Sequence, residues 1–220
     1  MLTVHHLNNS RSQRVLWLLE ELGVPYDLVK YERDRKTMLA PPELQKIHPL
    51  GKSPVITDGE DTIAESGAIV EYIVDQYGDG KLMPSRGSQD YLRARYYMHY
   101  AEGSLMPLLL LKLIFGRIKT APVPFFIKPI TKKIANQVES TFTDPNLERH
   151  VKFLDGELAK STWFAGNDLT IADIQMIYPM EALAARWPNA PQTIKSWVER
   201  VQARPAYKRA EERGGKSAVF

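Results

Sequence analysis

Hydrophobic positions in the first 78 residues alternate between strand-like and helix-like spacing. Short β-type runs at residues 2–7 and 26–31 predict two strands, and the runs at 54–58 and 61–65 predict a hairpin pair. Apolar residues at positions 15, 18, 19 and 22 have the spacing of an amphipathic helix, which Gly23 ends. Further helices are predicted at 41–48 and 66–77. This alternation is typical of an α/β sheet with helices packed on its faces.

The stretch from Gly78 to Ser88 concentrates Gly, Pro and Ser without periodicity, which indicates a linker. Beyond it strand signals almost vanish, and an apolar stripe from Ala94 to Leu109 predicts a long helix that Pro107 kinks. Residues 120–124 are expected to break the chain before helices at about 125–142, 145–160, 171–186 and 191–204. We therefore predict an α/β domain over residues 1–78, a linker over 79–88 and an all-helical domain over 89–220.

The segment LTIAD, residues 169–173, is typical of a helix start. Thr170 is expected to cap backbone N–H groups, and Asp173 to reach back as the other half of a capping box. A cap of this kind contributes about 1 kcal/mol to stability. We therefore interpret Asp173 as a structural residue and not as a catalytic carboxylate.

The amino-acid composition excludes several classes of function. The chain has 220 residues and no cysteine, so disulfides, thiolate metal sites and cysteine nucleophiles are excluded together. Any thiol chemistry must use a sulfur from another molecule. No apolar run approaches the roughly 18 residues of a membrane span. The first nine residues lack the pattern of a secretory signal, so we expect a cytoplasmic protein.

Charged residues are distributed unevenly. Residues 1–78 carry 8 Lys and Arg against 12 Asp and Glu, whereas residues 79–220 carry 21 against 14. The best basic cluster, Lys128, Lys132 and Lys133, reads as a solvated helix face, so no nucleic-acid partner is expected. The histidines show no metal-ligand spacing, because His5 and His6 are adjacent on a strand and point to opposite faces. We expect no metal.

Polar side chains crowd the turn between the first strand and the first helix. Ser10 to Gln13 has the Ser-x-x-Gln pattern of a capping box, so a plain N-cap is sufficient to explain Ser10. Asn9 and Arg11 lie in the same turn.

Several motifs occur in order along the chain: HHLNNSRSQRVLWLLEELGVPYD, IHPLGKSPVI, AESGAIVEYI and LTIADI, with YAEGSLMP in the first long helix. Together they resemble the cytosolic glutathione transferases, in particular the bacterial and fungal branch that includes the yeast enzyme. The resemblance covers essentially the whole chain. It implies a thioredoxin-like α/β domain with a mixed four-stranded sheet that binds glutathione, and an all-α C-terminal domain that supplies the electrophile pocket. It also implies a homodimer.

The resemblance implies that Ser10 donates a hydrogen bond to the glutathione sulfur. A free thiol with a pKa near 8.5 is only a few per cent ionised at neutral pH. Half ionisation at pH 7 requires a shift of about 1.5 units, or roughly 2 kcal/mol, which one hydrogen bond to a charged acceptor can supply. Related branches place the activating group one or two positions away, so Asn9 and Arg11 stay open as alternatives. Arg11 would add a full positive charge.

The resemblance also implies which residues hold the rest of glutathione. By sequence alone, Pro54 is an ordinary trans proline at a strand start and Lys52 a solvated charge. The resemblance instead implies a cis Ser53–Pro54 bond, with the Ser53 backbone pairing with the cysteinyl residue and Lys52 reaching the glycyl carboxylate. Ser66 is expected to be the N-cap of the third helix and to hold the γ-glutamyl carboxylate, while Glu65 faces the ammonium group.

The first long helix carries Tyr97, His99, Glu102 and Met106, and the resemblance implies that this helix faces the sulfur. Their helical spacing fits ordinary core and surface positions equally well. With Tyr178 they form the candidate electrophile pocket.

We expect a glutathione transferase that adds the glutathione thiolate to hydrophobic electrophiles. Reduction of peroxides or disulfides with the same thiolate is an alternative. A non-catalytic adaptor with the same architecture is a third interpretation. The presence of Glu65, Ser66 and Ser10 argues against it, because an adaptor needs none of these residues.

Overall fold

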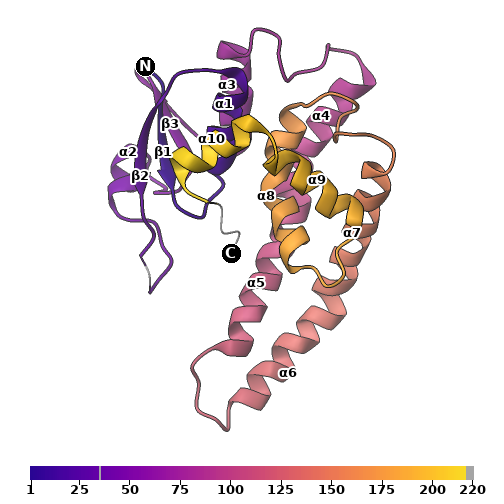
Figure 1. Cartoon of the computed structure of the whole chain (residues 1–220). Helices are drawn as coiled ribbons and strands as arrows, with labels where there is room; N and C mark the ends of the chain where they lie inside the picture. The colour runs from indigo at the N-terminus through magenta and orange to yellow at the C-terminus, as the bar shows by residue number, and fades with distance from the viewer. Residues whose placement is uncertain (35, 217–220) are drawn as a thin grey trace.

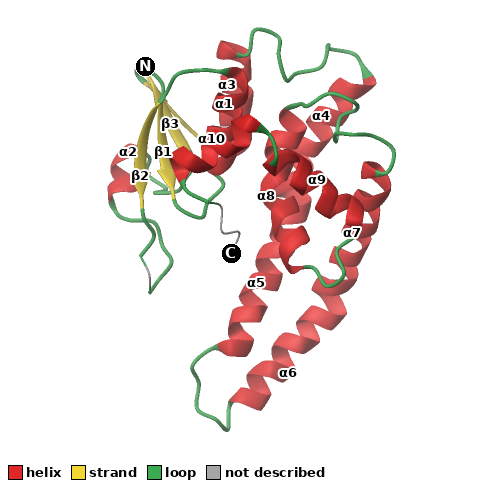
Figure 2. Cartoon of the chain, in the orientation of Figure 1, coloured by secondary structure: helices red, strands yellow, loops and turns green. Residues whose placement is uncertain are grey.

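A computed structural model of the chain describes residues 1–34 and 36–216. Its N-terminal part contains a sheet of four strands, β1 (Thr3–Leu7), β2 (Asp27–Tyr31), β3 (Val55–Asp58) and β4 (Asp61–Ala64). The strand order is β2-β1-β3-β4, with β1 parallel to β2 and the other two pairs antiparallel. The predicted mixed four-stranded sheet is therefore confirmed (Figure 2).

The same part of the chain contains three helices, α1 (Gln13–Leu22), α2 (Glu43–Ile47) and α3 (Ser66–Tyr77). Every residue of α1 from Gln13 to Leu19 is buried, so this helix lies inside the molecule and not on its surface. As predicted, Gly23 ends α1 in the left-handed conformation, with φ at 70°. Glycine adopts this conformation without the steric cost that a Cβ atom would add.

The remainder of the described chain is mostly helical. Residues 78–88 form neither helix nor strand, and the helices that follow are α4 (Gln89–Tyr100), α5 (Met106–Thr120), α6 (Lys128–Val138), α7 (Asp144–Leu158), α8 (Ile171–Arg186), α9 (Gln192–Gln202) and α10 (Pro205–Gly214). The division into domains at residues 79–88 stays a prediction. None of the described helices is both long and apolar enough to cross a membrane.

Helices α4 and α5 form one long, interrupted helix. A π-helical turn, Ala101–Leu105, joins them, and Pro107 occupies the first turn of α5. An interruption was expected here, because proline lacks an N–H donor and clashes with the preceding turn. A second π-helical turn, Glu139–Thr143, joins α6 to α7. The predicted gap before Pro145 is therefore wrong: the helix continues through the π-helical turn into α7, and Pro145, which has no N–H to donate, lies directly after that turn.

Helices α5 and α6 lie side by side and extend away from the rest of the molecule (Figure 1). The predicted break between them is confirmed, since α5 ends at Thr120 and α6 begins at Lys128, three residues later than expected. The tip and flank of this helical arm expose the apolar side chains of Phe125, Phe126, Ile130 and Ile134.

No helix is predicted after Arg204, yet α10 follows it directly. This helix returns to the N-terminal part and packs against α1, with the Tyr207 ring 5.7 Å from that of Trp17. Arg204 forms an ion pair with Glu21 of α1 at 2.5 Å. The final helix therefore lies with the sheet and not with the helical bundle that precedes it in sequence.

The predicted capping box of α8 is confirmed. One carboxylate oxygen of Asp173, Oδ2, accepts the N–H of Thr170 at 2.9 Å, and the other accepts the N–H of Phe164 at the same distance. Burial raises the pKa of Asp173 to about 7. Its carboxylate thus ties the start of α8 to the preceding loop, as a structural residue does.

Candidate functional site

A pocket of about 240 Å³ opens where the turn before α1, the segment before β3 and the start of α3 meet. All the residues implied for glutathione binding at 52–54 and 65–66 lie in its wall, which consists of Arg11, His48, Leu50, Lys52, Ser53, Pro54, Ala64, Glu65, Ser66 and Glu102. The fold therefore brings together residues from three separate stretches of sequence. Their roles stay a prediction.

The peptide bond between Ser53 and Pro54 is cis, as the resemblance implied. The Ser53 hydroxyl donates to the carbonyl oxygen of His5 at 3.0 Å and accepts the N–H of Leu7 at 3.2 Å. Both partners belong to β1, so this side chain anchors the segment to the sheet.

Glu65 and Ser66 lie at the pocket end of α3. Glu65 occupies the N-cap position with φ at 70°, and Ser66 is the first helical residue, so the prediction that Ser66 is the N-cap is wrong by one residue. A positive φ is rare for a residue with a side chain, and such conformations gather at functional sites. The Ser66 hydroxyl accepts from Nη1 of Arg14 at 3.2 Å and from Nε2 of Gln175 at 3.3 Å.

Glu102 is held between two arginines. Its carboxylate accepts from Nε of Arg11 at 3.0 and 3.1 Å and from Nη1 of Arg14 at 2.5 Å. Burial disfavours the charged carboxylate, but the charges of Arg14 and Arg11 outweigh this effect and hold the pKa of Glu102 below its usual range. Both guanidinium groups lie over the ring of Tyr178, at 5.5 and 5.4 Å from its centroid. The cluster of Arg11, Arg14 and Glu102 carries a net positive charge beside the pocket.

The side chain of Ser10 turns into the protein. Burial lowers the pKa of His6 to about 4, so its ring is neutral at pH 7. Its Nε2 lies 2.9 Å from the carbonyl oxygen of Gly214 and must donate there, which leaves Nδ1 as an acceptor for the Ser12 hydroxyl at 2.8 Å. The Ser10 hydroxyl in turn lies 2.7 Å from that of Ser12, to which it donates.

The Ser10 hydroxyl also accepts the N–H of Ser12 at 3.2 Å, within the turn before α1. The N-cap of α1 is Ser12, so the prediction that Ser10 is the N-cap is wrong by two residues. The reciprocal half of the predicted capping box is absent, because no bond from the Ser10 N–H to the Gln13 side chain occurs among the described residues. Nε2 of Gln13 is buried without a partner there. Ser10 is not among the described residues that line the pocket, whereas Arg11 is. Asn9 precedes Ser10 in the same turn and has a positive φ of 49°.

Two residues of this site were not predicted. Arg14 is completely buried, and with Gln175 it holds the Ser66 hydroxyl. A signal existed for Arg14: it stands in an otherwise apolar helix, and a buried arginine requires an anionic partner. No sequence signal pairs it with Glu102, which lies 88 positions away.

The candidates for the electrophile pocket lie in three different environments. Glu102 lines the 240 Å³ pocket, and Tyr178 lies beneath Arg11, which also lines it. Tyr97 packs in the helical core, where its hydroxyl donates to Glu157 at 3.2 Å, and Met106 is also buried in the core. His99 is exposed. Helical spacing alone does not distinguish these environments.

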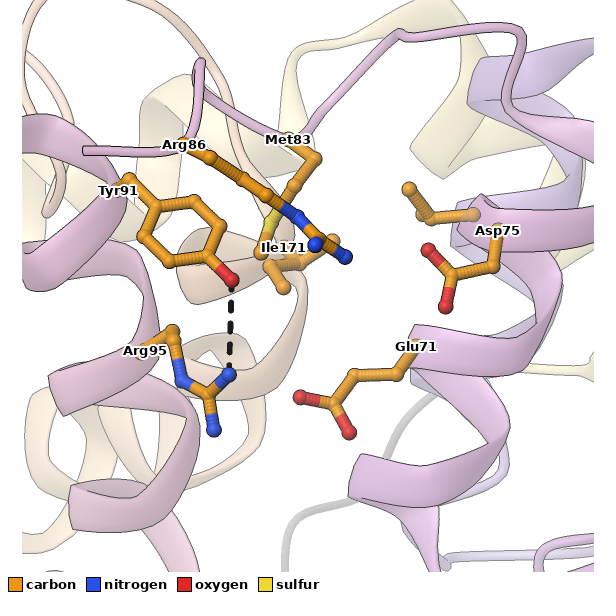
Figure 3. A pocket seen from close by; sticks show the side chains of 8 residues that line it. Glu71, Asp75, Met83, Arg86, Tyr91, Arg95 and Ile171 are labelled. Carbon is orange, nitrogen blue, oxygen red and sulfur yellow. Dashed lines mark hydrogen bonds between the residues drawn. The ribbon is translucent and has the colours of Figure 1, made fainter. Parts of the chain in front are cut away.

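Another pocket, of about 230 Å³, lies between α3 and α4 and contains none of the predicted site residues. Arg86 and Arg95 face Asp75 and Glu71 across it (Figure 3). The hydroxyl of Tyr91 accepts from Arg95 at 3.5 Å. Because each positive charge faces a negative one, the charges of this pocket are balanced locally. Among the described residues, no group of His, Asp and Glu is arranged to hold a metal ion.

The chain is similar to known glutathione S-transferases along most of its length. The family model for the glutathione S-transferase N-terminal domain matches residues 1–75, and that for the C-terminal domain matches residues 119–205. Glutathione S-transferase 1 of Saccharomyces cerevisiae is 31% identical, over 97% of this chain and 95% of the yeast protein. Glutathione S-transferase 3 of Schizosaccharomyces pombe is 34% identical, over 97% of this chain and 88% of that protein.

Solved structures show the same architecture. A glutathione S-transferase from Actinobacillus pleuropneumoniae superimposes with a TM-score of 0.78 at 28% identity, covering 100% of this chain and 95% of that one. A glutathione transferase from Phanerochaete chrysosporium, determined with oxidized glutathione, gives a TM-score of 0.74 at 20% identity over 96% and 93% of the two chains. The chain belongs to the glutathione S-transferase family of enzymes.

Proposed function

We propose that this protein binds glutathione in the 240 Å³ pocket and transfers its thiolate to a hydrophobic electrophile. The observation that carries this proposal is the convergence of Lys52, the cis Ser53–Pro54 segment, Glu65 and Ser66 on one pocket that Arg11 also lines. Each matches one chemical group of the tripeptide. The Ser53 backbone pairs with the cysteinyl residue, Lys52 binds the glycyl carboxylate, and Glu65 binds the γ-glutamyl ammonium.

Ser66 is positioned to bind the γ-glutamyl carboxylate. Its hydroxyl already accepts two hydrogen bonds, so its own proton is available to donate to an anion. The free N–H groups at the start of α3 add further donors. Arg14 and Gln175 act as positioning residues, since they orient this hydroxyl from behind.

We assign the stabilisation of the glutathione thiolate to Arg11. The Ser10 proton is engaged with Ser12, whereas Arg11 brings a positive charge to the pocket wall. A nearby cation favours the thiolate over the thiol and lowers the thiol pKa. The thiolate then attacks the electrophilic carbon: a C–S bond forms, and the leaving group departs with its electron pair or a double bond takes up the electrons.

The direct test combines binding with turnover. Calorimetric titration of glutathione should show saturable binding, and addition of 1-chloro-2,4-dinitrobenzene should give enzyme-dependent formation of the thioether at 340 nm. Glu65→Gln should weaken glutathione binding at least tenfold, because it removes the partner of the ammonium group. Absence of both heat and turnover at millimolar glutathione would refute the proposal.

Substitutions in the turn identify the activating group. We expect Arg11→Gln to lower kcat/KM at pH 6.5 about tenfold or more and to move its pH profile to higher pH, because the thiol loses a neighbouring charge. Ser10→Ala is the matched comparison and should change kcat/KM less than about threefold. The opposite order, with Ser10→Ala inactive and Arg11→Gln active, would assign the sulfur contact to Ser10.

We also propose that the protein is a homodimer. Leu92 and Tyr96 on α4 support this assignment, since both are large apolar side chains exposed on one helix. Light scattering after size-exclusion chromatography should give twice the 25.1 kDa of one chain. A cytoplasmic location stays a prediction.

A further inference from the structure

A larger cavity lies between α5 and α8, about 510 Å³ in volume. Leu109, Leu113 and Ala182 contribute apolar surface to it. Ala182 is one helical turn beyond Tyr178, whose ring lies under Arg11 at the glutathione pocket. The cavity therefore begins one turn of α8 away from the residue beneath Arg11, the side chain proposed to face the sulfur, and an electrophile must lie near that sulfur.

The walls of this cavity are cationic as well as apolar. Lys112, Arg117 and Arg186 line it, and no Asp or Glu does so among its described lining residues. The charge of Lys112 is offset by Glu139 at 2.9 Å and by Asp144 at 2.5 Å. Arg117 is exposed and has no salt bridge to a carboxylate within the part of the chain that the structure describes. Residues 103–138 contain six Lys and Arg and no acidic residue.

Arg33 adds a further positive charge that acts on Arg11 and Arg117. Its guanidinium donates to the carbonyl oxygens of Asn8 and Met38, at 3.2 and 3.0 Å, and so is bound without being neutralised. Burial lowers the pKa of Arg33, the proximity of Tyr178 raises it, and the charges of Arg11 and Arg117 lower it further. The positive charges of Arg11, Arg33 and Arg117 therefore reinforce one another.

We propose that the electrophile carries a negative charge. Its apolar body would lie between α5 and α8, and its carboxylate, sulfonate or phosphate would face Arg117. This inference rests on the proposed transferase function and names its substrate class. Of the cations that line the two pockets, Lys52 and Arg11 are assigned to glutathione itself. Lys112 is offset by two carboxylates, so we assign Arg117 to the second anion.

The test compares two electrophiles that react by the same step and differ in charge. In 4-chloro-3,5-dinitrobenzoate and 4-chloro-3,5-dinitrobenzamide, the thiolate attacks the carbon that bears chlorine, a C–S bond forms, and chloride leaves with the bonding electron pair. Each kcat/KM is divided by the rate constant of the uncatalysed reaction with glutathione, which removes the difference in intrinsic reactivity. We expect the corrected benzoate-to-benzamide ratio to be about ten or higher at low salt, and to fall as salt is added.

A substitution of Arg117 tests whether this residue causes the preference for the benzoate. Arg117→Gln should lower the ratio about fivefold, because it removes the charge and keeps most of the side-chain volume. Lys128→Gln is the matched control: it removes an exposed cation near the tip of the arm, outside the cavity, and should leave the ratio unchanged.

The outcomes separate the two proposals. Turnover of both compounds with a corrected ratio near one would overturn the inference about charge and leave the transferase function intact. An equal fall of the ratio in both variants would also overturn it, because the effect would then come from net charge and not from this cavity. Turnover of neither compound, together with no glutathione binding, would refute the transferase function itself.

Discussion

Ser10 and Arg11 are neighbours in sequence whose side chains point to different environments. Arg11 lines the pocket, whereas the Ser10 hydroxyl donates to a chain of hydrogen bonds that runs through Ser12 and His6 into the protein. The sequence predicted a polar turn at this place and three candidates for the sulfur contact. It did not determine which donor faces the ligand, because that depends on the rotation of each side chain and on which partners lie behind the turn.

Asp173 is a residue for which pattern and structure agree. Asp173→Ala should lower the free energy of unfolding by about 2–4 kcal/mol, because the N–H groups of Thr170 and Phe164 would be left buried and unpaired. The matched control is Asp168→Ala, since Asp168 is exposed in the same loop and should change stability by less than about 0.5 kcal/mol. Urea unfolding monitored by circular dichroism measures both. Equal stability of the two variants would contradict a structural role for the capping box.

At the scale of elements, strongly periodic and punctuated segments were predicted well, and α10 was not. Helix α8 was predicted with its observed bounds, and Gly23 ends α1 as expected. Helix α10 is mostly polar and buries only a narrow face, so its apolar pattern is too weak to stand out. Its position is set by residues of α1 that are almost the whole chain away, among them Glu20, which Arg209 contacts at 2.8 Å.

The stabilisation from packing α10 against α1 can be measured by substituting Tyr207, which is buried against Trp17. We expect Tyr207→Ala to lower the free energy of unfolding by about 3–5 kcal/mol, because it leaves a large cavity and removes the hydroxyl that donates to Glu181. Lys208→Ala, at an exposed position of the same helix, is the control for loss of a side chain and should have little effect. A small effect of both would mean that α10 contributes little to stability.

At the scale of the molecule, His6 links the two ends of the chain. It lies on β1, and its Nε2 donates to the carbonyl oxygen of Gly214 at the end of α10, while its Nδ1 accepts from Ser12. Burial favours the neutral ring here; a doubly protonated ring would donate from Nδ1 as well, so the Ser12 hydroxyl would have to accept and to donate its own proton elsewhere. One titratable side chain thus joins the sheet, the turn that carries the site, and the final helix.

The buried, neutral His6 ring predicts that the free energy of unfolding depends on pH. Burial lowers the pKa of His6 from 6.5 to about 4, so the unfolded chain binds more protons than the folded one between these values. The stabilisation is fully present above about pH 6.5 and is lost as the pH falls towards 4, by up to about 3 kcal/mol.

The contribution of Asp173 to stability changes with pH in the opposite direction in part of this range. Because its pKa is raised, ionisation of Asp173 destabilises the folded state as the pH rises towards 7. The His6 contribution is therefore isolated by the difference in unfolding free energy between the wild type and His6→Gln. This difference should shrink as the pH is lowered from 7 to 4. A difference that does not change with pH would show that His6 does not titrate in this way.

By itself, the pattern of residues determined the kinds of elements and their order, an α/β part followed by helices. The resemblance of the motifs to a known family implied the mixed sheet and the short stretches from which the pocket is built. Periodicity, proline and glycine act over a few residues, so they can be read without knowing the fold. The tertiary structure alone decided that Arg14 and Glu102 meet, that Ser10 faces inward, that Tyr97 lies in the core and that α10 returns to α1. Each of these depends on contacts between residues far apart in the chain, where burial and hydrogen bonding select one arrangement and local pattern has no influence.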